Sequence, residues 1–181
     1  MTAVTSPFTE PSRCKRLKAA SSRDHDSVDQ LVMAARPFEN RERYGRFLQV
    51  QHRFHGSLLA LYQDEQLNQQ LPGLAALSRF AAVEADLRDL GLSLPTSTQP
   101  VCVSSAQALG WLYCSEGSNL GAAFLYKHTQ RLGLEGDKGA RHLAPHPDGR
   151  ALHWRAFVAR LDSLVLGLSL IHISEPTRRY A

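Results

Sequence analysis

The segment 110–124, GWLYCSEGSNLGAAF, most constrains what this chain can fold into. Its apolar residues recur at helical spacing and predict a buried helix. The middle of that helix carries Gly117 and Gly121, one turn apart, with Ser118 and Asn119 between them. Each interior glycine costs a helix about 0.5–1 kcal/mol relative to alanine. We therefore expect a flat ligand against this bare face, or, as the alternative, a close crossing of two helices.

Composition narrows the class of protein. The chain has 181 residues with 43% hydrophobic content, which suits one globular domain with a full core. The formal net charge is +4, and the lysine and arginine residues alternate with aspartate and glutamate instead of clustering. We therefore expect no nucleic-acid partner. No apolar run approaches the ~18–20 residues of a membrane span, and the N-terminus lacks the apolar core of a signal peptide. Cys14, Cys102 and Cys114 lack metal-site spacing and are expected to be free thiols. These features predict a soluble, cytoplasmic protein, and we expect it to be a monomer.

Apolar spacing predicts an all-α, single-domain bundle without period-two segments. Asn40 is expected to cap the second helix, and Gly91 to end the third. Residues 64–70 are expected to form a turn. The predicted helices span residues 14–35, 41–62, 74–90, 104–133 and 150–165. Apolar residues expected to face the core are Leu17, Val28, Leu31, Val32, Tyr44, Phe47, Leu48, Phe54, Leu58, Leu61, Leu109, Trp111, Leu112, Phe124, Leu125, Leu152, Trp154, Phe157, Val158 and Leu161.

His25 lies on the apolar face of the first helix, where a histidine is more often a core residue than a ligand. Lys18 lies two turns earlier on the same face, about 10 Å away along the axis. Asp29 follows one turn later and is expected to join the polar network around His25. An imidazole with a cation about 10 Å to one side suits a metalloporphyrin, with iron at its centre and propionates at its edge. A solvated flank charge is the alternative interpretation of Lys18.

Three longer blocks resemble bacterial heme oxygenases of the iron-acquisition type. They are KRLKAASSRDHDSVDQLVMAARPF, GWLYCSEGSNLGAAFLYKH and GARHLAPHPDGRALHWRAFVARLD, and the resemblance covers residues 15–165. It implies that heme lies between a proximal N-terminal helix and a glycine-kinked distal helix. His25 matches the iron ligand, and Lys18 and Tyr113 match residues beside the propionates. The other implied site residues are Gly117 and Gly121 against the heme, Ser118 and Asn119 in the same distal turn, and Gln51 and His55 in an ordered-water network.

The resemblance also implies an activity. Heme b is both cofactor and substrate, and oxygen and reducing equivalents convert it to biliverdin, carbon monoxide and ferrous iron. The implied electron donor is a ferredoxin or a flavin or NADPH reductase. A heme-binding carrier or sensor on the same fold is the alternative function. A related helical fold that degrades thiamin is a more distant alternative, without a nucleophilic cysteine in an obvious context.

The remaining histidines near the C-terminal helix match the family pattern, but we interpret them as structural or surface groups. These are His142, His146 and His153, together with Arg141. A metal site of His142 and His146 at helical spacing is disfavoured, because Pro145 lies between them.

The chain is expected to comprise a lead-in at 1–12, a heme oxygenase domain at 13–167 and a tail at 168–181. The tail begins LSLIHISEPTR, which resembles the translation of a transposase adapter used in sequencing libraries. We therefore predict that it is non-native. The resemblance implies that a further C-terminal helix of the family is missing here.

Overall fold

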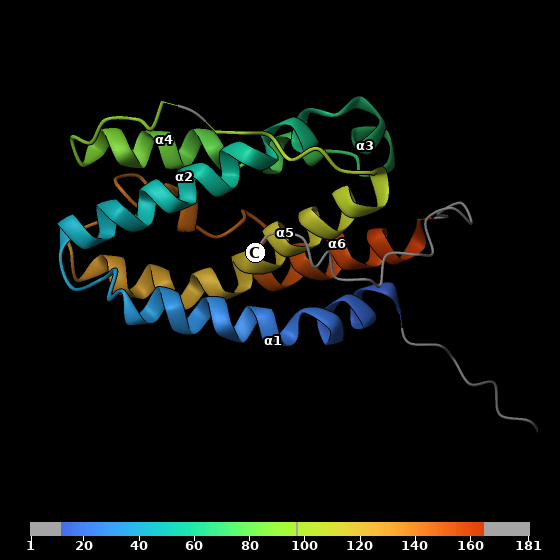
Figure 1. Cartoon of the computed structure of the whole chain (residues 1–181), viewed down its shortest axis with the longest axis horizontal. Coiled ribbons are helices and arrows are strands. Elements are labelled where there is room, and N and C mark those ends of the chain that lie inside the picture. Colours follow the sequence, from blue (N-terminus) through green and yellow to red (C-terminus); the bar gives the residue numbers. More distant parts are fainter. Residues whose placement is uncertain (1–11, 97, 165–181) are drawn as a thin grey trace, which may run out of the picture.

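The computed structural model describes residues 12–96 and 98–164, and this part of the chain is helical with no β-strand. The predicted all-α class is confirmed. The predicted tail at 168–181 lies outside the described residues. The elements in chain order are α1 (Arg13–Ala34), α2 (Arg41–Gln63), α3 (Glu65–Gln70), the 3₁₀ helix η1 (Leu74–Leu77), α4 (Phe80–Asp89), α5 (Ser105–Gln130), the 3₁₀ helix η2 (Arg141–Leu143) and α6 (Arg150–Ser163) (Figure 1).

The predicted cap of α2 is present, and α5 is capped as well. Asn40 Oδ1 accepts a hydrogen bond from the Arg43 amide at 2.9 Å. Ser104 and Gln107 form a capping box, in which each side chain bonds the other's backbone amide. These contacts satisfy amides that the first turn of a helix leaves unpaired.

Two of the expected boundaries are wrong. The expected turn at 64–70 contains α3, which begins where Asp64 Oδ1 accepts a hydrogen bond from the Leu67 amide at 2.8 Å. The expected single helix at 74–90 is divided into η1 and α4, because the backbone at Ser78 is extended. Arg79 fixes this break, since its Nη1 donates to the carbonyl oxygens of His142 and Ala144 at 2.6 and 3.0 Å. A tertiary contact thus overrides helix propensity.

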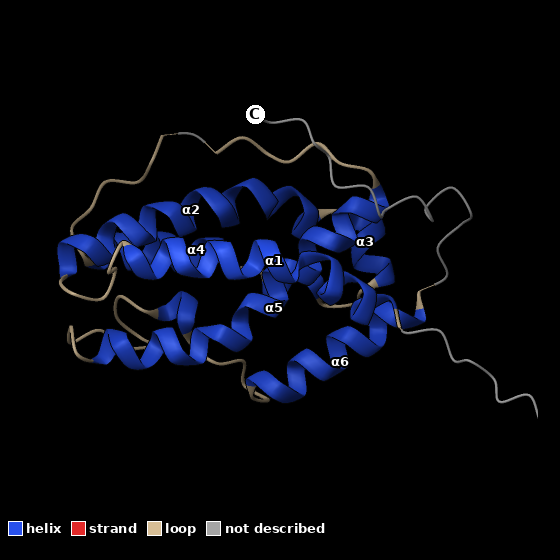
Figure 2. Cartoon of the chain, turned by 60° about the horizontal axis from the view of Figure 1, so that its bottom comes forward, coloured by secondary structure: helices blue, strands red, loops and turns tan. Residues whose placement is uncertain are grey.

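The helices pack into two layers, with α2 against α4 and α5 against α6 (Figures 1 and 2). Two apolar clusters form the core. One joins α2, α3, α5 and α6 around Leu58, Leu112 and Leu161. The other joins α2 and α4 to the loop after α5, around Leu48 and Leu87. Within residues 12–96 and 98–164, no helix is long and apolar enough to cross a membrane.

Helix α1 is held at its two ends. At its start, the Arg13 guanidinium donates to the carbonyl oxygens of Leu161 and Leu164 at 2.6 and 2.8 Å. Beyond its end, Ala35 O accepts a hydrogen bond from Arg43 Nη1 at 2.9 Å. Every residue from 18 to 31 between these anchors is exposed. The helix therefore bridges an open face of the molecule.

Several residues expected in the core are instead exposed. Val28 and Leu31 are 56% and 72% exposed, because the middle of α1 does not lie on the core. Phe124 is 56% exposed, so the predicted apolar face of α5 is only partly covered. Two further corrections are Trp111 and Leu152, which are 39% and 54% exposed.

Candidate functional site

The open face of α5 carries Gly121. No described residue places an atom within 4 Å of the position that a Cβ on Gly121 would take, apart from the local helix backbone. Phe124 follows on the same face, and its ring meets His128 edge-on at 4.5 Å. His128 in turn stacks on Phe38 at 5.5 Å, and Phe38 contacts Phe47 of α2 at 5.7 Å. An aromatic path thus leads from this face of α5 to the space between α1 and α2.

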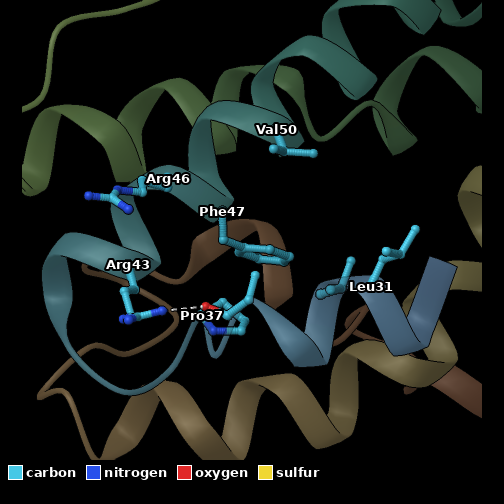
Figure 3. Close-up of a pocket in the computed structure, with 8 residues that line it drawn as sticks. Leu31, Pro37, Arg43, Arg46, Phe47 and Val50 are labelled. Carbon is cyan, nitrogen blue, oxygen red and sulfur yellow. Dashed lines mark hydrogen bonds between the residues drawn. The ribbon is translucent and has the colours of Figure 1, made fainter.

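That space contains a cavity of about 380 Å³. Leu31 of α1 and Phe47 and Val50 of α2 line it, together with Pro37 of the connecting loop (Figure 3). Arg43 lies at its edge, fixed by its bond to Ala35 O and by Glu39, whose Oε2 is 3.0 Å from Arg43 Nε. The volume is in the range of small-molecule and cofactor sites, and the lining favours an apolar ligand.

His25 lies in the exposed middle of α1, and its side chain is 68% exposed. Its Nδ1 is 3.6 Å from a carboxylate oxygen of Asp26 and 3.6 Å from one of Asp29. The expected proximity of Asp29 to His25 is therefore found. Lys18 is also exposed, two turns earlier on α1. No core contact occupies His25, so the interpretation of His25 as a satisfied core histidine is wrong.

The two glycines of α5 meet different surroundings. A Cβ on Gly117 would lie 3.2 Å from the indole of Trp154 on α6. The Tyr113 ring, one turn earlier, also contacts Trp154, with 5.1 Å between ring centroids. Burial raises the pKa of Tyr113, so its phenol stays protonated at neutral pH. The expected bare face is thus covered by Trp154 near Gly117 and open near Gly121. Helix α5 is continuous through both glycines.

Asn119 does not share the face of Gly121, whereas Ser118, three residues before Gly121, lies about 60° from it around the helix. The Ser118 hydroxyl donates to Ser115 O at 2.7 Å. Asn119 is buried at 7% exposure, and its Nδ2 donates to Glu116 Oε2 at 3.3 Å. Successive helical residues are about 100° apart, so Asn119 lies roughly 160° around the helix from Gly121. The Asn119 side chain belongs to the buried side of α5.

A buried polar network lies behind α5, and sequence reasoning missed its centre. Glu116 is 2% exposed; its Oε1 accepts from the Tyr62 hydroxyl at 2.6 Å, and its Oε2 lies 2.9 Å from His153 Nε2. Burial and the neighbouring Glu116 raise the pKa of Tyr62 well above its usual value. Burial lowers the pKa of Arg79, while the charge of Glu116 opposes this shift. The Arg79 guanidinium therefore lies near enough to Glu116 to feel its charge.

His55 extends this network from α2. It is 5% exposed, and burial lowers its pKa to about 3, assisted by His142 and Arg79. His55 is therefore neutral at physiological pH, and its Nδ1 has no protein partner among the described residues. Gln51, one turn earlier, is half-buried. Buried polar atoms normally bond protein or ordered water, so His55 suits the predicted water network.

His142 is a core residue, as the structural interpretation predicted. Its ring is 1% exposed, and Nδ1 lies 2.8 Å from Asp86 Oδ2. The Asp86 carboxylate also accepts bonds from the backbone amides of Arg141 and His142, at 2.9 and 3.0 Å. His146 and His153 stack on each other at 4.3 Å, with the rings 15° from parallel. The charged residues Glu116, Asp86 and Arg79 gave no sequence signal for burial, because charged residues are mostly exposed.

The fold and the site define a class: an all-α protein with an exposed histidine on α1, a small-residue face on α5 and an apolar cavity between α1 and α2. The family model for heme oxygenase matches residues 12–171. Heme oxygenase PigA of Pseudomonas aeruginosa is 44% identical over 157 residues, which cover 85% of this chain and 79% of that protein. A heme oxygenase from Neisseria meningitidis, solved with NO and CO bound, superposes with a TM-score of 0.83 at 49% identity, covering 88% of this chain and 80% of that one. The chain belongs to the heme oxygenase family.

Proposed function

We propose that this protein cleaves heme b oxidatively to biliverdin, carbon monoxide and ferrous iron, with His25 as the protein ligand of the iron. Family membership supports the activity. The observation that carries the site assignment is the exposed His25 in the exposed middle of α1, six residues before Leu31, which lines the apolar cavity. Heme, when bound, supplies both the iron that binds oxygen and the porphyrin carbon that is oxidised.

His25 is suited to iron through its Nε2. Its Nδ1 lies 3.6 Å from the carboxylates of Asp26 and Asp29. In a histidine that binds a metal, a carboxylate beside the other ring nitrogen orients the ring and makes the histidine a more basic ligand. We assign Asp29 this role, because an i, i+4 residue lies on the same helix face as His25.

The open face of α5 and the cavity between α1 and α2 fit a flat, apolar group with anionic edges. Gly121 leaves space beside the backbone of α5, and Leu31 and Phe47 line the cavity. Lys18, two turns before His25, is assigned to pair with a propionate. Tyr113 is assigned a propionate hydrogen bond, because its phenol remains a donor at neutral pH.

The residues on the distal side of the heme, from α5 and α2, are assigned two roles. Those of α5 exclude competing chemistry, and those of α2 hold ordered water. Gly117 and Gly121 present no acidic or basic side chain on the open face of α5. Ser118 and Asn119 are assigned to hold the turn from Gly117 to Gly121, through their bonds to Ser115 and Glu116. A neutral His55 can accept a hydrogen bond from a water molecule at Nδ1, and it does not place a protonated imidazole in the site. Gln51, one turn earlier on α2, is assigned to the same water chain.

Reaction of the purified protein with hemin, a reductant and oxygen tests this function. The expected result is loss of the heme absorption band, followed by the spectrum of biliverdin and release of carbon monoxide and iron. A heme-binding carrier or sensor would bind hemin in the same titration and return it intact. Stable heme after many equivalents of reductant would therefore overturn the proposal.

The physiological setting is proposed on the same basis. We assign the reaction to iron acquisition from heme in the cytoplasm, carried out by a monomer. Electrons would come from a ferredoxin or a flavin or NADPH reductase that docks on the cationic surface near Lys18. Loss of growth on heme as the iron source, after deletion of the gene, tests this setting separately from the chemistry.

A further inference from the structure

Three helices meet at the buried carboxylate of Glu116. Tyr62 of α2 donates to Oε1 at 2.6 Å, while His153 of α6 and Asn119 of α5 both approach Oε2, at 2.9 and 3.3 Å. A buried carboxylate is costly unless hydrogen bonds and an opposite charge compensate it. Arg79 supplies the nearby positive charge. The position of Glu116 is therefore tightly set by its neighbours.

The first turn of α6 contacts this part of α5 at three adjacent points. Arg150 Nη1 donates to Asn119 O at 2.9 Å, and His153 Nε2 lies at Glu116. Trp154 lies against Gly117, where a Cβ would come within 3.2 Å of the indole. We call Arg150, His153 and Trp154 the α6 clamp.

We propose that the α6 clamp positions the turn of α5 from Gly117 to Gly121, with His153 as its positioning residue acting through Glu116. The inference rests on the proposed function, because it takes this turn as the face that meets the heme. Glu116 directly precedes Gly117, so the bonds that hold its carboxylate to α2 and α6 also restrain the backbone where the turn begins. The clamp therefore sets how closely the turn lies to its ligand.

The chemistry of His153 explains why it is the decisive member. Its Nε2–H is a directional donor to a charged acceptor, and such bonds are stronger than neutral ones. Without it, Glu116 Oε2 keeps only the longer contact to Asn119 at 3.3 Å. The buried charge then gains from turning toward water, which loosens the turn.

Hydrogen exchange in the heme-free protein tests the clamp without turnover. We expect His153→Leu to accelerate amide exchange at residues 117–121 by about tenfold or more, while the amides of Val83 and Leu87 in α4 keep their wild-type rates. His153→Gln should restore slow exchange, because its side-chain amide can donate to Glu116. If His153→Leu does not fold, Glu116→Gln provides the second variant, with the same local acceleration expected.

The loaded protein gives an independent measurement. His153→Leu should bind hemin with an affinity close to that of the wild type but yield a broader mixture of biliverdin isomers. The wild type and His153→Gln should yield the same isomer distribution as each other. Wild-type exchange and an unchanged isomer pattern in His153→Leu would overturn the clamp. Equal acceleration in every helix would overturn it too, because that result indicates general destabilisation. Failure of the wild type to open heme would instead overturn the proposed function, while the exchange result would still decide the contact between α6 and α5.

Discussion

Substitution of Gly121 by alanine distinguishes the effect of this glycine on helix stability from its proposed role in heme binding. A Cβ at Gly121 meets no atom of the described residues within 4 Å beyond the local backbone. The heme-free variant should therefore gain about 0.5–1 kcal/mol of stability from the better helix propensity of alanine. For a chain of this size, 1 kcal/mol corresponds to roughly 2–4 °C in Tm. Thermal and urea unfolding of the heme-free protein measure this gain.

The same methyl group should weaken heme binding. If the heme plane lies against Gly121, the added carbon overpacks the contact, which costs about 1–3 kcal/mol. An affinity loss of about tenfold corresponds to 1.4 kcal/mol, so a hemin titration should detect it. Gly121→Val should lose more affinity or redirect the oxidation to another porphyrin carbon.

Two further glycines of α5 provide matched controls. Gly110 lies on the same face two turns before Gly117, and a Cβ there also meets open space. Gly110→Ala should therefore gain the same stability and leave hemin binding unchanged. In Gly117→Ala the new Cβ lies 3.2 Å from Trp154, so the gain in propensity is offset by a tight contact. A stabilised Gly121→Ala variant that binds hemin with wild-type affinity, spectrum and products would refute the assigned heme face.

Three other predictions concern single groups. His25→Ala should abolish biliverdin formation although hemin still associates, and added imidazole should restore part of the activity; full activity without imidazole would exclude His25 as the ligand. The pKa of His55 is lowered from 6.5 to about 3 by burial, so its neutral form stabilises the fold above about pH 6.5, and this stability is lost as pH falls toward 3. Urea unfolding at about pH 7 and about pH 5 should show a loss of up to ~1.4 kcal/mol per pH unit from this group, and His55→Gln should have a smaller loss. Burial raises the pKa of Cys14 to about 12, so a thiol reagent should modify exposed Cys102 in the native protein and Cys14 only after unfolding.

Much of the fold could be predicted from local signals. The helix boundaries near Asn40 and Ser104 follow from side chains that bond the first free amides of a helix, and those residues are visible in the sequence. The break at Ser78 could not be predicted, because it depends on Arg79 reaching the carbonyls of the segment at η2. No local pattern reports a partner more than sixty residues away.

The site was predictable in its ligand helix and not in its buried half. His25 and Asp29 share a helix face by spacing, and the structure places them together. Val28 and Leu31 follow the same periodicity, which indicates an apolar surface but cannot distinguish a protein core from a ligand site. Their exposure in the folded chain shows that this face is not core, and it supports the proposed ligand site.

The spacing of the glycines in α5 was also consistent with two interpretations that the sequence could not distinguish. Gly117 and Gly121 are equivalent by period, and both a ligand face and a close helix crossing were consistent with them. The structure assigns one meaning to each: Gly117 admits the indole of Trp154, and Gly121 leaves the backbone open. In the proposed site the two meanings act together, because Trp154 and the bond from His153 to Glu116 would hold the helix in position while Gly121 meets the heme. The two glycines are thus equivalent in the sequence but differ in the fold, because only Gly117 is packed against another helix.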